Sequence, residues 1–151
     1  MGGVKILIFL LIPIIGFCQT SELTLNDIKS INSVEMYKKV MMERGLEKND
    51  EEGKEGVNIV YNDIISSDGI DTQLSTIYYI ENDVCLITFD TNNGIYEDEY
   101  DGLFNNVKSN CNYFGIDSSI DTEFIQYDCG DGFKIGFGRE SNFSFILKYP
   151  K

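Results

Sequence analysis

Residues 121–150, DTEFIQYDCGDGFKIGFGRESNFSFILKYP, decide the fold that this sequence predicts. The stretch contains three apolar segments, separated at Gly130-Asp131-Gly132 and again at Glu140-Ser141-Asn142. Alternate positions of the last two segments are apolar: Phe133, Ile135 and Phe137, and then Phe143, Phe145, Leu147 and Tyr149. A period of two is typical of an antiparallel sheet with one buried face, and we expect most of these aromatic side chains to lie in the core.

Two segments upstream follow a helical period instead. Residues 33–44 carry apolar side chains at three- and four-residue steps, and Gly45 stands where a helix often ends. Asn32, with Glu35 three residues later, is a candidate N-cap for this helix, as Thr24 with Asp27 is for a short helical turn before it. A second long helix is expected after the acidic run Glu97-Asp98-Glu99, ending near Cys111.

Strands are also expected around Val57–Tyr61, at Leu74–Ile80 and at Val84–Phe89, whereas the charged residues 46–56 indicate a loop. Both halves of the chain then have the order helix, strand, strand, strand. The predicted fold class is α+β, with an antiparallel sheet of five to six strands and two helices on one face.

The first 18 residues have the layout of a secretory signal peptide. A short basic start at Lys5 precedes the apolar run Ile6 to Phe17, which is too short for a stable membrane-spanning helix. We expect cleavage after Cys18, export to the periplasm or the extracellular space, and a single α+β domain over residues 19–151. The bulky Phe17 disfavours the alternative, a lipid anchor on Cys18. The apolar run and its ending resemble the leaders of exported proteins from Gram-negative bacteria.

The charge balance is strongly acidic. The chain has 12 basic and 25 acidic residues, a net charge of −13, and loss of residues 1–18 would remove only the single charge of Lys5. Such a balance argues against a nucleic-acid partner, which requires a basic footprint. It also argues against binding to anionic membranes, and no other apolar run approaches membrane length, so we expect no stable membrane insertion of the mature chain.

Three cysteines remain after the predicted leader: Cys85, Cys111 and Cys129. In an oxidising compartment a pair is expected, and Cys111–Cys129 would join the end of the second long helix to the end of the strand at 124–129. Other pairings of the three remain open at this point. Cys85 lies between Val84 and Leu86 in a predicted strand, where a small buried side chain is expected.

The sequence contains no histidine. Catalytic triads and dyads that use histidine, and histidine-ligated zinc, are therefore excluded. No phosphate-binding glycine motif is present either. We expect a non-enzymatic protein without a cofactor.

Carboxylates are the groups that could support an alternative, a calcium-dependent or hydrolytic domain. Two loops gather acidic residues that calcium could use as oxygen ligands: Asp63, Asp68 and Asp71, and Asp117, Asp121 and Glu123. Neither spacing matches a helix–loop–helix calcium site, and turns rich in Asp and Ser have a conformational explanation as well.

Tyr78 and Tyr79 are adjacent in a predicted strand and must point to opposite faces. One of them is expected on the helix-free side of the sheet, as part of a possible recognition surface. The repeated layout of helix and antiparallel strands resembles that of bacterial inhibitor and immunity-type proteins. This resemblance implies a small exported domain that binds a protein or another ligand.

Overall fold

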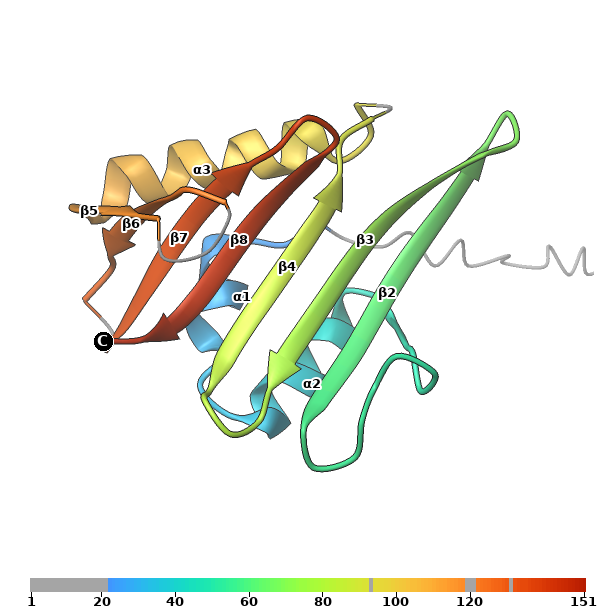
Figure 1. Ribbon diagram of the computed structural model, residues 1–151, viewed down its shortest axis with the longest axis horizontal. Helices are drawn as coiled ribbons and strands as arrows, with labels where there is room; N and C mark the ends of the chain where they lie inside the picture. The colour runs from blue at the N-terminus through green and yellow to red at the C-terminus, as the bar shows by residue number, and fades with distance from the viewer. Residues whose placement is uncertain (1–21, 93, 119–121, 131) are drawn as a thin grey trace, which may run out of the picture.

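A computed structural model describes residues 22–92, 94–118, 122–130 and 132–151, and the predicted leader at 1–18 lies outside these ranges. The described residues form one antiparallel sheet with helices packed behind it in the view of Figure 1. The predicted α+β class with an antiparallel sheet is confirmed. The predicted element count is wrong, because the described residues form eight strands and three helices.

The elements follow one another in this order along the chain: α1 (Leu25–Ser30), α2 (Val34–Glu43), β1 (Glu47–Lys48), β2 (Asn58–Ser67), β3 (Ile70–Tyr79), β4 (Val84–Asp90), α3 (Glu97–Asn110), β5 (Asn112–Asp117), β6 (Phe124–Asp128), β7 (Phe133–Arg139) and β8 (Phe143–Pro150). The order of strands across the sheet is β1-β2-β3-β4-β8-β7-β6-β5. Each half of the chain thus contributes four neighbouring strands, and the halves meet where β4 pairs with β8.

The helix boundaries have local causes. The Thr24 hydroxyl accepts a hydrogen bond from the Asp27 N–H, and the Asp27 carboxylate accepts one from the Thr24 N–H, so the predicted cap of α1 is confirmed as a capping box. The cap of α2 is Ser33, which accepts from the Met36 N–H, and the prediction of Asn32 is wrong by one residue. Gly45, at φ 84°, follows the C-cap of α2 as expected, because glycine adopts positive φ without steric cost.

All three helices lie on one face of the sheet. The Tyr37 hydroxyl of α2 is 2.9 Å from the Thr76 carbonyl of β3, and the Tyr100 ring of α3 lies 5.8 Å from Phe89 of β4. α1 is held by Lys148 of β8, whose ammonium group donates to the carbonyl oxygens at the end of that helix. Thr76, Phe89 and Lys148 are all buried on this face, which we call the helix face.

The missed strands are both edges of the sheet. β1, with two residues, falls in the stretch predicted as a charged loop. β5 directly follows α3, and a bulge between Tyr113 and Gly115 interrupts its pairing with β6, which removes the period of two from its sequence.

The predicted disulfide between Cys111 and Cys129 is confirmed. It joins the C-cap of α3 to the residue after β6. The two cysteines are 18 residues apart in the sequence, and the segment between them contains β5. Cys85 is free and buried, and burial raises the pKa of its thiol to about 12. It is therefore a packing residue and a poor nucleophile at neutral pH.

β8 is oriented opposite to expectation. Its buried side chains are Ser144, Ile146 and Lys148, whereas Phe145 and its alternating neighbours face the other side of the sheet. Lys148 is only 2% exposed, and its Nζ lies 2.8 Å from the Ile28 carbonyl and 2.9 Å from the Lys29 carbonyl. The lysine is accepted on the buried face because the carbonyl groups in the last turn of a helix lack the usual partner four residues later and favour a positive charge.

Candidate functional site

The first group of calcium candidates is divided between the two faces of the β2–β3 hairpin. Asp63 pairs with Leu74 and faces the helices, where it accepts a hydrogen bond of 2.8 Å from the Tyr96 hydroxyl. Asp71 pairs with Ser66, and its carboxylate accepts a hydrogen bond from the Ser66 hydroxyl on the opposite face. Asp68 lies in the turn, with a φ of 52°. Because side chains alternate along a strand, these three carboxylates do not converge.

The second group does not provide a cage either. The Asp117 carboxylate accepts a hydrogen bond of 2.8 Å from the Gln126 amide, and Glu123 lies on a different surface, in a groove beside α3. Asp121 is outside the described residues. Within the described ranges, no three acidic or cysteine side chains come together as metal ligands.

Glu99 is the carboxyl group whose pKa is raised to near neutrality. Burial raises its pKa to about 7, the charges of Glu22 and Asp63 add to the shift, and the Leu23 N–H opposes it by donating a hydrogen bond of 2.7 Å. Such a pKa suits an acid–base catalyst. The carboxylate is occupied, however, in holding the chain just before α1, so we assign it a structural role.

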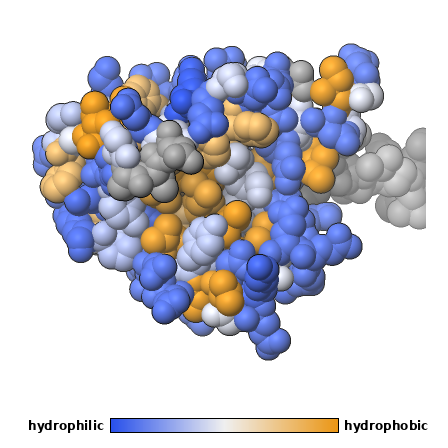
Figure 2. Space-filling model, in the orientation of Figure 1, coloured by the Kyte–Doolittle hydropathy of each residue, from blue (hydrophilic) through white to orange (hydrophobic). Residues whose placement is uncertain are grey.

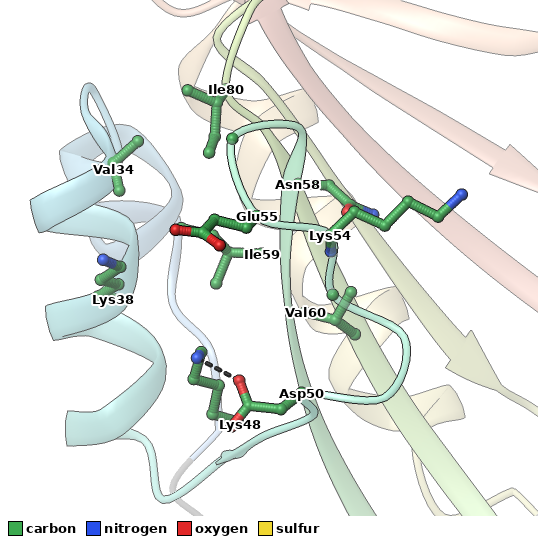
Figure 3. Close-up of a pocket in the computed structure, with 12 residues that line it drawn as sticks. Val34, Lys38, Lys48, Asp50, Lys54, Glu55, Asn58, Ile59, Val60 and Ile80 are labelled. Atoms are coloured by element: carbon green, nitrogen blue, oxygen red, sulfur yellow. Dashed lines mark hydrogen bonds and ion pairs between the residues drawn. The ribbon is translucent and has the colours of Figure 1, made fainter.

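A pocket of about 490 Å³ lies between α2 and the loop that leads into β2 (Figure 3). Its volume suits a small molecule. Val34, Ile59 and Ile80 provide apolar walls, and the charged side chains at the opening have both signs, with Lys48 and Asp50 forming an ion pair. The opening carries no strong excess of either charge that would select an ion.

The helix-free face of the sheet carries an apolar surface at its centre. Ile77 of β3 lies opposite Leu86 of β4, and Leu86 lies opposite Leu147 of β8, so that three apolar side chains form a row across the centre of the sheet. Phe145 lies next to this row on β8. We call Ile77, Leu86, Phe145 and Leu147 the central apolar patch, and all four are half-buried.

Figure 2 shows this face, with hydrophobic atoms gathered near its middle and hydrophilic atoms over much of its margin. Tyr79, 37% exposed, lies at one border of the patch. Tyr78 points to the helix face instead, where it is buried against Tyr37 with ring centroids 5.1 Å apart. Of the adjacent tyrosines, Tyr79 is therefore the one that a partner on the helix-free face could reach.

The other end of this face contains a cationic and aromatic cluster. The Lys134 ammonium group lies 3.6 Å from the centroid of the Phe114 ring and 5.9 Å from that of Tyr149. The Tyr149 hydroxyl is buried without a hydrogen-bond partner in the described part of the chain. A buried hydroxyl normally has a hydrogen-bond partner, so the Tyr149 hydroxyl is an exception among the described residues.

The alternation of residues in β8 contained the signal for this surface, but the wrong face was taken as buried. An apolar row and a row with serine and lysine were both visible in the sequence. Alternation divides a strand into two faces without identifying the one that the helices cover.

No family model, curated protein or solved structure matches this chain. Among the described residues, no helix combines the length and the hydrophobicity that crossing a membrane requires.

Proposed function

We propose that this chain is an exported, non-enzymatic protein-binding domain that uses the helix-free face of its sheet. The observation that carries the proposal is the orientation of β8, which buries Ser144 and Lys148 and turns Phe145 and Leu147 to the helix-free face, where both are half-buried. Apolar surface left uncovered at the centre of a sheet is typical of an interaction site.

The chemistry of the patch favours a protein partner over a small ligand. The central apolar patch crosses three strands, and Tyr79 at its border provides a ring with a polar tip. Aromatic side chains are enriched at the centres of protein interfaces. The disulfide supports an oxidising compartment, in agreement with the predicted leader.

Site-specific photo-cross-linking in the native host tests this proposal. A benzophenone amino acid in place of Tyr79 should form a discrete adduct with one partner protein. The same amino acid in place of Met42, which is exposed on α2 at the other side of the sheet, is the matched control and should form no such adduct.

Adding Leu86→Arg to the Tyr79 photo-variant places a charge in the central apolar patch and should remove the adduct. Circular dichroism of the purified variant checks that the fold is retained. An adduct of equal yield from the Met42 position, or an adduct insensitive to Leu86→Arg, would contradict the proposal.

A further inference from the structure

A second surface, on the outer edge of β5, has the properties of a strand acceptor. β5 has six residues, and its ladder joins it only to β6 in the described structure. Natural sheets normally protect such an edge with lysine, proline, a β-bulge, a covering loop or a very short strand. The bulge in β5 lies between Tyr113 and Gly115, and residues 115–117 beyond it pair regularly with β6. β5 contains neither lysine nor proline, and Asp117 at its end is its one charged residue.

β5 presents apolar side chains on both faces. Tyr113 and Ile116 face the helix side and are 64% and 60% exposed, and Phe114, displaced by the bulge, is 54% exposed on the other side. A strand added at this edge would cover all three side chains, because neighbouring strands bring same-face residues into contact.

A groove of about 420 Å³ adjoins Ile116 on the helix face, between α3 and the sheet. Its apolar walls are formed by Phe104 of α3 and by Ile125 and Phe137 of the strands. Ile116 of β5 lines this groove and is 60% exposed, so the groove reaches the β5 edge and offers room for a side chain of an added strand.

The charges at the groove favour a basic partner. Its lining includes Asp101, Glu123 and Arg139. The Arg139 guanidinium lies 2.6 Å from Asp101 and 3.8 Å from Glu97, so it is already paired with two carboxylates. The lining of the groove therefore has a net charge of −1, of the same sign as the net charge of −13 of the whole chain. Lys108, beside Phe104, and Lys134, beside Phe114, lie outside this lining. A second copy of this chain would bring the same negative charge and be repelled.

We propose that β5 and the adjoining groove bind an extended polypeptide segment that joins the sheet as an additional strand, with alternating apolar residues and Lys or Arg at its ends. Backbone hydrogen bonds would provide affinity, and the groove would select the apolar side chains. This site is separate from the central apolar patch, so the inference stands or falls independently of the proposed function.

A defined peptide tests the strand addition. The probe is a fluorescent, end-blocked peptide of sequence Lys-Val-Thr-Val-Thr-Val-Lys, and its binding to the disulfide-bonded protein is measured by fluorescence anisotropy. Two methylated forms are compared, one with N-methyl groups on the Val residues and one with N-methyl groups on the Thr residues. The N–H groups of alternate residues point to opposite edges of a strand, so one form should bind like the parent peptide and the other should lose binding. Equal affinity of the two methylated peptides would overturn the proposal.

Two protein variants with matched exposure locate the site. Ile116→Lys should weaken binding of the peptide by about tenfold or more, because it places a positive charge at the edge, and this charge repels the lysines of the peptide. Ile64→Lys, at a position on β2 that is 58% exposed, should leave the affinity within about twofold. Equal effects of the two variants would place the binding elsewhere and overturn the assignment.

Two further outcomes test the chemistry of the partner. The peptide with Glu in place of both Lys residues should bind about tenfold or more weakly, and undiminished binding would overturn the basic character of the segment. Sedimentation of the unliganded protein should show a monomer. A dimer that Ile116→Lys converts to a monomer would assign the edge to a second copy and overturn the proposal.

Discussion

Each half of this molecule has helix before four strands, with two helices in the first half and one in the second, and the halves differ in their outer strands. In the first half, α1 and α2 lie behind the strands, and the sheet ends in β1, two charged residues long. In the second half α3 stands alone, and the sheet ends in β5, six residues long with exposed aromatic side chains. The difference shows that one sheet can end in a very short charged strand on one side and in a longer, largely apolar strand on the other.

The two halves also differ in the interactions that stabilise them. α1 and α2 are joined by an ion pair in which Arg44 lies 2.7 Å from Asp27, and α1 is anchored by Lys148. In the second half a covalent bond, Cys111–Cys129, closes the segment that contains β5. An edge strand without a second helix behind it has few packing partners, so a disulfide is an effective way to keep it ordered while its outer side stays open.

The largest expected effect is on the second half. Replacing both Cys111 and Cys129 by Ala should lower the free energy of unfolding by about 3 kcal/mol, as expected for a loop of this length. Hydrogen exchange should become faster at the amides of β5 and β6 and remain unchanged in β2. The Cys85→Ala variant, which alters a buried thiol without breaking a cross-link, should lose only about 1 kcal/mol. Unchanged exchange at β5 in the double variant would refute the stabilising role of the disulfide.

The first half depends on a contact from the second. Lys148→Met keeps an apolar side chain of similar length but removes the ammonium group from the carbonyl oxygens at the end of α1, and should cost about 2 kcal/mol in urea unfolding. Lys39→Met, at an exposed position on α2, should change stability by less than about 0.5 kcal/mol. If the two variants were equally stable, α1 would not depend on β8.

A smaller effect comes from Glu99, at which α3 contacts the chain before α1. Burial raises its pKa to about 7, so the folded state holds the proton more tightly than the unfolded state does. The stabilisation from protonation is complete below the unfolded value near 4.5 and is lost as the pH rises through 7. Glu99→Gln keeps an oxygen acceptor for the Leu23 N–H and removes the charge.

The Gln variant should therefore be more stable than the wild type at pH 8, by about 1 kcal/mol after allowance for the partial exposure of the carboxyl group. At pH 5 the two proteins should differ little. Thermal unfolding at both pH values provides the measurement, and a stability difference that does not change with pH would show that Glu99 titrates normally.

The sequence predicted those elements whose period is regular. α2, α3 and the strands β7 and β8 follow uninterrupted helical or alternating patterns. The cysteine pair at the ends of α3 and β6 was predicted from the positions of the two residues. β5 was missed because its bulge places Phe114 and Gly115 opposite the single residue Gln126 and breaks the alternation.

The orientation of β8 could not be predicted from its own residues. A lysine normally marks the solvent side of a strand, and Lys148 is buried here only because the end of α1, 117 to 120 residues earlier, presents its carbonyl groups. Alternation predicted that Tyr78 and Tyr79 point to opposite faces but did not identify the one on the helix-free face. The central apolar patch required the strand order, which brings β4 and β8 together.

The orientation of β8 can be tested through the reactivity of its lysine. Reductive dimethylation of the native protein, followed by peptide mass spectrometry over time, compares Lys148 with the exposed Lys39. The structure predicts that Lys148 remains unmodified until the protein unfolds, while Lys39 reacts at the rate of a free amine. Modification of both lysines at the same rate in the folded protein would mean that β8 is shifted by one residue, with Phe145 and Leu147 in the core, and would contradict the binding surface proposed above.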